Sequence, residues 1–291
     1  MKISIKILIF GIASLLSIVN ISAQNKSYID NNIIIWGTGG QSALTSVLPA
    51  INSTWGLGYG VGAGYEFQYK NFSILTGVEY THLKPSLKLD NFSIDVSNLI
   101  DSEGDRFLGH YTFSNNSDKY SLGNINFPLE FGFRSNLFYF LAGLKVGMNI
   151  LAKSKTESLV SFSGTYENYL GTFENMPNHS FGSFNPINEY QPIISLNCSA
   201  TAEAGVTFGN KTKYRLGVFF DYGLLNVNGN ALQSLVLYKP DNIPYLNNYL
   251  TGLGTPASIM YGGLKFTVLL KLNKKTDCKC DNVATKSRIR R

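Results

Sequence analysis

The sequence predicts an all-β fold: an eight-stranded antiparallel transmembrane up-and-down β-barrel with short periplasmic turns and long extracellular loops. Three observations predict this fold. Eight segments alternate between apolar residues and small or polar ones, which is the period of a β-strand. The connections between these segments alternate between short and long. The chain also begins with a segment typical of secreted proteins.

The first 23 residues have the three parts of a secretory signal peptide. Lys2 and Lys6 supply positive charge, residues 7–19 are apolar, and residues 21–23 (ISA) end in a small residue, Ala23. We expect cleavage after Ala23, with an uncleaved N-terminal membrane anchor as the alternative. The sequence then divides into a signal peptide (1–23), an outer-membrane β-barrel (24–273) and a basic periplasmic tail (274–291).

The clearest predicted strand covers residues 55–69, with the sequence WGLGYGVGAGYEFQY. Its odd positions, from Trp55 to Tyr69, are apolar or aromatic, and its even positions are glycine or polar. The first predicted strand, residues 32–38, shows a weaker alternation, and the third, residues 72–82, shows a clear one. We therefore expect each of these strands to have one apolar and one polar face.

Five further segments complete the predicted sheet. They share the same alternation and cover residues 121–134, 138–151, 196–208, 214–225 and 264–272. In the first of these, Phe127, Leu129 and Phe131 alternate with Asn126 and Glu130.

The predicted connections alternate in length. Short ones cover residues 70–71, 135–136 and 209–213, whereas long polar ones cover 39–54, 83–119, 152–195 and 226–258. Because every second connection is long, all long connections emerge at one end of the sheet. This arrangement is typical of outer-membrane barrels.

A hydrocarbon environment explains the two faces of residues 55–69. Backbone polar groups in lipid must be paired within the protein, which a closed sheet achieves. The apolar face then meets lipid, while glycines on the narrow inner face leave space for larger side chains of neighbouring strands. The alternative is a soluble sandwich or lipocalin-like barrel. Five alternating glycines on a water-facing surface make that alternative less favourable.

Composition agrees with this environment. Only 15% of residues are charged, whereas 13% are aromatic, and no long apolar run follows the first 23 residues. The net charge of +6 comes from the C-terminal segment after residue 270, which argues against a nucleic-acid-binding domain. The three cysteines, Cys198, Cys278 and Cys280, do not form a disulfide framework.

Nine charged residues fall on the predicted inner faces: Glu66, Glu79, Glu130, Arg134, Lys145, Glu203, Arg215, Asp221 and Lys265. Five of them (Glu79, Lys145, Glu203, Asp221 and Lys265) lie at similar distances from the short turns, so we expect them to meet in one middle layer. Buried charges are tolerated when they are paired. We interpret the nine as a structural charge network that fills the interior. A proton or ion path, or a gate, is the alternative.

Other reactive residues carry weaker signals. His82, His110 and His179 lie at or beyond the loop-side ends of strands, but no GxSxG nucleophile motif accompanies them. Cys278 and Cys280 make at most an incomplete metal site. We therefore predict no catalytic, cofactor-binding or metal-binding residues and no cofactor.

Several runs of residues carry a resemblance to a known family: 55–69, 124–130 (NINFPLE), 138–147 (FYFLAGLKVG) and 261–266 (YGGLKF). At these residues the chain resembles the small outer-membrane β-barrel proteins of Bacteroidota, the outer membrane protein beta-barrel domain group that includes Por-type secretion accessory barrels. The resemblance covers most of residues 28–273. It implies an eight-stranded barrel in the outer membrane and no catalytic residues. The basic tail with its Cys-Lys-Cys sequence departs from the family pattern.

These observations predict a non-enzymatic protein of the cell outer membrane with a structural, surface-binding or secretion-accessory role. The alternatives are a small outer-membrane enzyme with a rim active site for lipid or glycan, and a narrow channel. Expected partners are outer-membrane lipid and a periplasmic or secretion-machinery protein that the tail contacts; nucleic acid is not expected.

Overall fold

The computed structural model describes residues 29–46, 50–101, 103–135, 137–166, 171–174, 181–190, 196–209, 212–226, 234–238, 244–254 and 256–272. The predicted signal peptide, the tail with Cys278 and Cys280, and His179 lie outside these residues. Among the described residues, no helix has the length and apolar character needed to cross a membrane.

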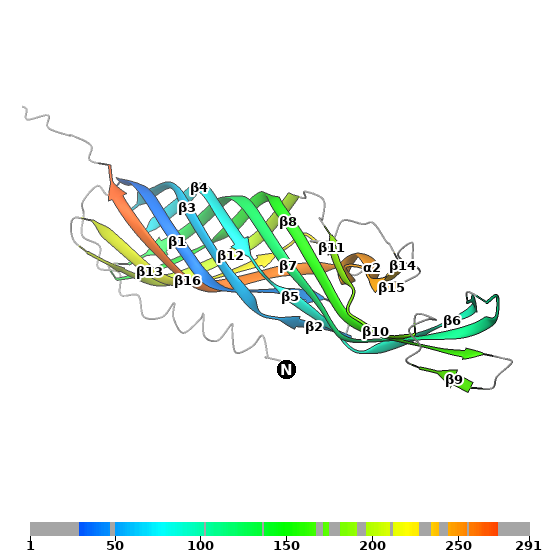
Figure 1. Ribbon diagram of the computed structural model, residues 1–291. Coiled ribbons are helices and arrows are strands. Elements are labelled where there is room, and N and C mark those ends of the chain that lie inside the picture. The colour runs from blue at the N-terminus through cyan, green and yellow to red at the C-terminus, as the bar shows by residue number, and fades with distance from the viewer. Residues whose placement is uncertain are drawn as a thin grey trace, which may run out of the picture.

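Eight long strands form a closed antiparallel ring (Figure 1). They are β1 (Ile29–Ser46), β3 (Gly56–Tyr69), β4 (Phe72–Leu83), β7 (Arg106–Arg134), β8 (Phe138–Tyr166), β12 (Leu196–Phe208), β13 (Lys213–Gly223) and β16 (Ala257–Lys271). Each strand pairs with the next in the order β1-β3-β4-β7-β8-β12-β13-β16, and β16 pairs with β1. The ring therefore leaves none of these eight strands with an unpaired edge along its shared length.

The short connections lie together at one end of the ring. Ile29 is paired with Tyr69 and Asn32 with Lys271, so the first and last ring strands also have their outer ends there. The connections after Tyr69, Arg134 and Phe208 are all short. The predicted antiparallel sheet and its alternation of connection lengths are confirmed, and each predicted strand overlaps one ring strand.

The predicted long loops, however, are largely wrong. Residues 39–46 continue β1, residues 106–120 belong to β7, and residues 152–166 belong to β8. The remaining long connections contain further short elements: β2 (Ile51–Thr54), β5 (Ser86–Leu89), β6 (Phe92–Ile100), β9 (Gly171–Phe173), β10 (Gly182–Phe184), β11 (Ile187–Tyr190), β14 (Val236–Tyr238), β15 (Pro244–Leu246) and the helical turn α2 (Tyr249–Gly252). Figure 1 shows β7 and β8 extending past the other strands to β6 and β9.

Irregularities in the β7–β8 pairing explain the part of this error that concerns β7 and β8. The register shifts between Ser114 and Ser117, and again between Gly123 and Asn124. Asn115, inside the first shift, has a φ of 53°. Such a bulge moves the following residues to the opposite face of the strand. A strict alternation therefore breaks at these points, although the strands continue.

Along the ring, apolar side chains face outward. On β3, the side chains of Leu57, Tyr59 and Val61 are 74%, 55% and 57% exposed, whereas the glycines between them are buried. The same pattern continues around the ring. Exposed apolar residues on the other strands include Ile33, Ile35, Ile74, Val78, Phe127, Leu129, Phe131, Phe138, Phe140, Leu144, Val146, Leu216, Val218, Phe220, Leu264 and Phe266. We call this surface the apolar band.

The inner-face glycines make room for large side chains. Trp36 on β1, Gly62 on β3 and Glu79 on β4 lie directly opposite one another in the sheet. A Cβ atom on Gly62 would lie 2.3 Å from the Trp36 ring. The missing side chain therefore lets the indole lie across β3, where its Nε1 donates a hydrogen bond to Glu79 Oε2 at 2.9 Å.

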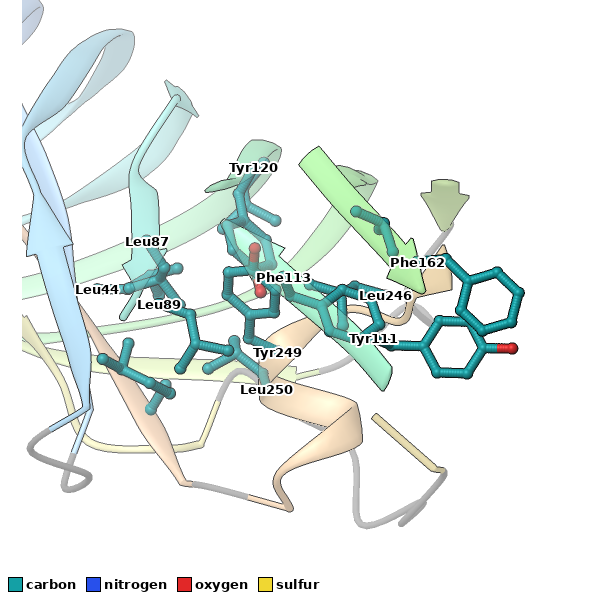
Figure 2. Close-up of a cluster of buried hydrophobic side chains, with 14 of the residues drawn as sticks. Leu44, Leu87, Leu89, Tyr111, Phe113, Tyr120, Phe162, Leu246, Tyr249 and Leu250 are labelled. Carbon is teal, nitrogen blue, oxygen red and sulfur yellow. The ribbon is translucent and has the colours of Figure 1, made fainter. Parts of the chain in front are cut away.

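A hydrophobic core begins at the end of the ring away from the short turns and continues into the β7–β8 extension. Figure 2 shows Leu246, Tyr249 and Leu250 packed beside Phe113 and Tyr120 of β7. These side chains are at most 4% exposed. The chain before β16 therefore folds back against the extension, which buries its apolar side chains as a water-soluble domain does.

Replacing Gly62 by alanine is expected to destabilise the ring by about 1–3 kcal/mol, because the new methyl group overlaps the buried Trp36 ring. Urea unfolding of refolded protein in detergent measures this loss. Gly39→Ala is the matched control, since a Cβ on Gly39 meets no atom within 4 Å. Equal stability of both variants would contradict the packing of Trp36 over Gly62.

Candidate functional site in the ring interior

All nine predicted charged residues are buried. They come from seven strands: Glu66 (β3), Glu79 (β4), Glu130 and Arg134 (β7), Lys145 (β8), Glu203 (β12), Arg215 and Asp221 (β13), and Lys265 (β16). None is more than 7% exposed. Because their partners lie on strands that are not neighbours in the ring, the side chains must cross the interior to meet.

Lys145 lies at the centre of the first ion-pair cluster. Its Nζ is 3.1 Å from Glu79 Oε1 and 2.8 Å from Asp221 Oδ2. Glu79 and Asp221 each lie two strands away from Lys145, on opposite sides of it. The ammonium group also lies 5.8 Å from the centre of the Phe219 ring. One lysine thus connects strands across half of the ring.

Lys265 lies at the centre of the second ion-pair cluster. Its Nζ is 2.6 Å from Glu203 Oε2 and 3.9 Å from Glu130 Oε2. Tyr139 donates a hydrogen bond of 2.5 Å to the other oxygen of Glu203. Glu203 is therefore held by a lysine and by a tyrosine from a neighbouring strand.

Trp36 joins these two clusters. Its ring centre lies 5.2 Å from Lys265 Nζ, and its indole nitrogen donates to Glu79. A cation over an indole face is attracted by the ring electrons. The clusters of Lys145 and Lys265 together with Trp36 form the layer that we call the ion-pair layer.

The remaining charged residues lie closer to the short turns. Arg215 Nη2 is 2.6 Å from Glu66 Oε1, and its guanidinium lies 4.8 Å from the centre of the Tyr139 ring. Arg134 donates a hydrogen bond to Gln68 at 2.9 Å. The nine residues are therefore brought together at two levels of the interior.

This arrangement fills the interior and fixes how the strands meet. Removing one partner of a buried ion pair leaves an uncompensated charge, which is strongly unfavourable. Each pair therefore constrains two strands to one relative position. The chemistry that it supports directly is charge neutralisation across the ring.

A cavity lies between the ion-pair layer and the long connections. The volume open to water inside it is about 50 Å³. Its wall includes Thr81, Asn124, Asn126, Asn197, Asp221 and Tyr261. Asp221 belongs to both the ion-pair layer and this cavity, so the two are continuous.

Asp118 is a buried acid that the sequence analysis did not identify. Its Oδ2 accepts hydrogen bonds from the Tyr120 hydroxyl at 2.6 Å and from the Tyr249 backbone N–H at 3.1 Å. Thr156 donates to its Oδ1 at 3.2 Å. Burial raises the pKa of Asp118 to about 6, against the lowering effect of these hydrogen bonds.

Through these hydrogen bonds, Asp118 fastens the start of α2 to the β7–β8 extension. The sequence could have identified Asp118 only with knowledge of the bulge at Ser114–Ser117. After that bulge, even-numbered residues of β7, which include Asp118, lie on its inner face.

Two of the three histidines lie in the described part of the chain. His82 is buried at the end of β4, where its Nε2 is 3.3 Å from the Ser121 hydroxyl. His110 lies on the surface of the extension, with Nδ1 2.7 Å from Asp95 and Nε2 2.9 Å from Thr165 Oγ1. These groups belong to adjacent strands of one exposed sheet face, so we interpret them as a row of cross-strand pairs.

Metal binding and thiol chemistry have little support in the described residues. Within the described residues, no three His, Cys, Asp or Glu side chains are grouped closely enough to hold a metal ion. Cys198 is a free, half-buried thiol beside the cavity.

Replacing Lys145 by methionine is expected to destabilise the protein by about 3–5 kcal/mol, because Glu79 and Asp221 lose their shared cation. Double-mutant cycles with Glu79→Gln and Asp221→Asn, measured by urea unfolding, should each show coupling of about 0.5–3 kcal/mol. The matched control is Glu203→Gln, since Glu203 pairs with Lys265 instead. Coupling as large for Glu203 as for the other two acids would contradict these pairings.

Because of Asp118, we expect the free energy of unfolding to depend on pH. Its pKa of about 6 exceeds its ordinary value of 3.8, so the folded state holds this proton more tightly than the unfolded state. The associated stability is present below about pH 4 and is lost as the pH rises through about 6. Unfolding of the wild type and of Asp118→Asn should therefore be compared between pH 4 and 7.5. The wild type should lose about 2–3 kcal/mol relative to the variant over this range. A constant difference would contradict a raised pKa.

Comparisons with known proteins give little further information. No family model matches the chain, and no curated protein matches it. Among solved structures, the chain is similar to Ail, the attachment invasion locus protein of Yersinia pestis, in complex with the heparin analogue sucrose octasulfate. The match covers 82% of this chain and 98% of that chain, with 9% identity and a TM-score of 0.24. At this TM-score the likeness carries no inference about what this chain does.

Proposed function

We propose that the chain is a non-enzymatic protein of the outer membrane that crosses the bilayer as an eight-stranded β-barrel. The observation that carries this proposal is the inverted ring: apolar side chains face outward and paired charges face inward. A water-soluble barrel would have the opposite arrangement. Lipid as the surrounding solvent accounts for both faces at once.

The size of the apolar band supports a membrane crossing. A tilted strand needs about 9–11 residues to span the hydrocarbon region. β12 has 13 residues and β13 has 11. Aromatic residues lie near the turn end of the band, where Tyr69 and Phe72 are 50% and 66% exposed. Trp55, which is 54% exposed, lies near the other end. Aromatic residues at both ends suit the two membrane interfaces.

The interior supports a structural role more than solute conduction. Eight strands leave an interior just wide enough for side chains. Here Trp36, Tyr139 and the ion-pair layer occupy it. A channel would need a continuous wet path through this layer. We therefore favour a closed barrel over the narrow channel.

The β7–β8 extension supports a surface-binding role. It continues beyond the apolar band, contains a large part of the hydrophobic core, and has polar residues such as Thr112 and His110 on its outer surface. We propose that it stands outside the cell, with the short turns and the basic tail in the periplasm. We also propose that the basic tail contacts a periplasmic protein or a protein of the secretion machinery. An enzyme at the rim has less support, since His110 lies on an open sheet face rather than in a cleft.

The outward position of Val61 tests this proposal. Val61→Arg places a charge in the apolar band and should destabilise the barrel in lipid vesicles by about 2–4 kcal/mol near the midplane. Ser161→Arg, at an exposed position of the extension, is the matched control and should change stability by less than about 0.5 kcal/mol. The wild type should fractionate with the outer membrane and migrate differently in gels after heating. Recovery in the soluble periplasm, or unchanged stability of Val61→Arg, would refute the proposal.

A further inference from the structure

We propose that a group of five lysines at one side of the outer rim of the ring binds the phosphate groups of lipids in the outer leaflet of the membrane. Lys84 follows β4, Lys88 lies on β5, Lys119 lies on β7, and Lys153 and Lys155 lie on β8. We call these five residues the lysine patch. The inference rests on the proposed membrane crossing, and it adds the chemical class of lipid that the barrel would bind.

The lysine patch covers β7 and the strands on either side of it, where the ring passes into the extension (Figure 1). Lys119 is directly opposite Ser86 of β5 on one side and Lys155 on the other. Ser121 of β7 is directly opposite Lys153. In the lysine patch, Lys155 is half-buried and the other four lysines are exposed. Because neighbouring strands are about 4.8 Å apart, ammonium groups from two or three strands can contact one ligand.

The lysine patch begins where the apolar band ends. On β7, the outward residues change from Phe127 in the band to Lys119 beyond it, and on β8 they change from Met148 to Lys153. A lysine keeps its ammonium group in a polar layer while its apolar stem lies along an apolar surface. In the proposed orientation, this level of the protein lies at the lipid headgroups of the outer leaflet.

The charge of the lysine patch is positive after its acidic neighbours are counted. Glu157 lies between Lys119 and Lys155, at 2.8 Å from each ammonium nitrogen. Hydrogen bonds from these two lysines lower the pKa of Glu157 to about 2, so this acid is ionised. Two further exposed acids border the patch: Glu189, opposite Lys155 on β11, and Asp90, directly after β5. Five lysines therefore face three acids, and an anionic ligand is favoured.

Three lysines of the patch have no acidic partner. Lys84, Lys88 and Lys153 form no ion pair within the described part of the chain. Lys119 and Lys155 share one acid although they lie directly opposite each other, and like charges in this position repel. An anion beside these groups would reduce the repulsion. A phosphate group has several acceptor oxygens, so it can contact more than one ammonium group at once.

The opposite side of the same rim differs from the lysine patch. At this end of β12 and β13, the described outward residues include Leu196 and Leu224, which are 69% and 52% exposed. No charged residue lies among the described outward positions at this end of these two strands. The positive charge is therefore gathered on one side of the ring. A merely solvated rim does not require this asymmetry.

The test measures lipid binding by the chain refolded in maltoside detergent. Phosphatidic acid and phosphatidylcholine, with the same acyl chains and the same fluorophore on one of them, are each titrated with protein. Fluorescence anisotropy gives the two dissociation constants. Their ratio cancels the contribution of the acyl chains and leaves the preference for an exposed, anionic phosphate. Inorganic phosphate is then added as a competitor, which distinguishes a lipid phosphate from a free one.

We expect the wild type to bind phosphatidic acid at least tenfold more tightly than phosphatidylcholine, since each lysine near an anionic headgroup contributes roughly fivefold in affinity. Combining Lys84→Gln with Lys153→Gln should remove most of this preference, although it breaks no ion pair. Combining Lys84→Arg with Lys153→Arg should retain the preference. Inorganic phosphate at the concentration of the lipid should not displace phosphatidic acid.

The matched control combines Lys70→Gln with Lys271→Gln. It removes the same charge from exposed lysines at the short-turn end of the ring, and the preference for phosphatidic acid should stay unchanged. Circular dichroism and migration in gels after heating establish that each variant is folded.

Three results would overturn the inference. The first is equal affinity of the folded wild type for both lipids. The second is an equal loss of preference in both pairs of glutamine variants, which would mean a general attraction between positive charge and anionic lipid. The third is displacement of phosphatidic acid by inorganic phosphate, which would make the ligand a free anion. All three would leave the membrane crossing intact, because Val61→Arg and fractionation test it separately.

Discussion

The pairing of charges inside a narrow ring is the constraint on which the rest of the structure depends. Lys145 lies between Glu79 and Asp221, and each of these acids comes from a strand that is not its neighbour. In a confined interior an unpaired charge is strongly unfavourable, so these contacts fix the relative positions of the strands that carry them. Close contact across the ring in turn requires small residues on the strands between. Gly62 meets this need, because its missing side chain lets Trp36 reach Glu79.

The two long strands combine two kinds of environment in one element. On the ring part of β7, Phe127 and Phe131 face outward while Asn126 and Glu130 are buried. On its extension, Phe113 and Tyr111 are buried in a core while Thr112 is exposed. The register shift at Ser114–Ser117 moves the inward positions from odd to even numbers between these parts. The sheet is therefore continuous. Its outer surface is apolar along the ring and polar along the extension.

The interior is also divided along its axis. The ion-pair layer crosses it, the cavity with Asn124 and Asp221 lies above this layer, and Asp118 with α2 lies further out. Asp118 is held by hydroxyl and backbone donors, so its charge is more costly to bury than that of an acid beside a lysine. The segment that it fastens is thus coupled to protonation, while the ion-pair layer depends on pairing.

The sequence by itself determined which residues alternate and therefore which strands form the ring and which charges lie inside it. That much follows from the two-residue period of a strand, as the outward Val61 and the inward Glu79 show. It did not determine the length of β7 and β8, because bulges interrupt the period at residues 114–117 of β7 and at residues 149–151 of β8. The sequence also did not determine which acid pairs with which lysine. Glu79 and Glu203 are equally plausible partners of Lys145 from their height on the strands alone, yet Lys145 contacts Glu79 and Asp221, and Glu203 contacts Lys265. Only the tertiary structure decided these pairs, along with the cavity and Asp118, because strand order and stagger around a closed ring set which side chains meet across it.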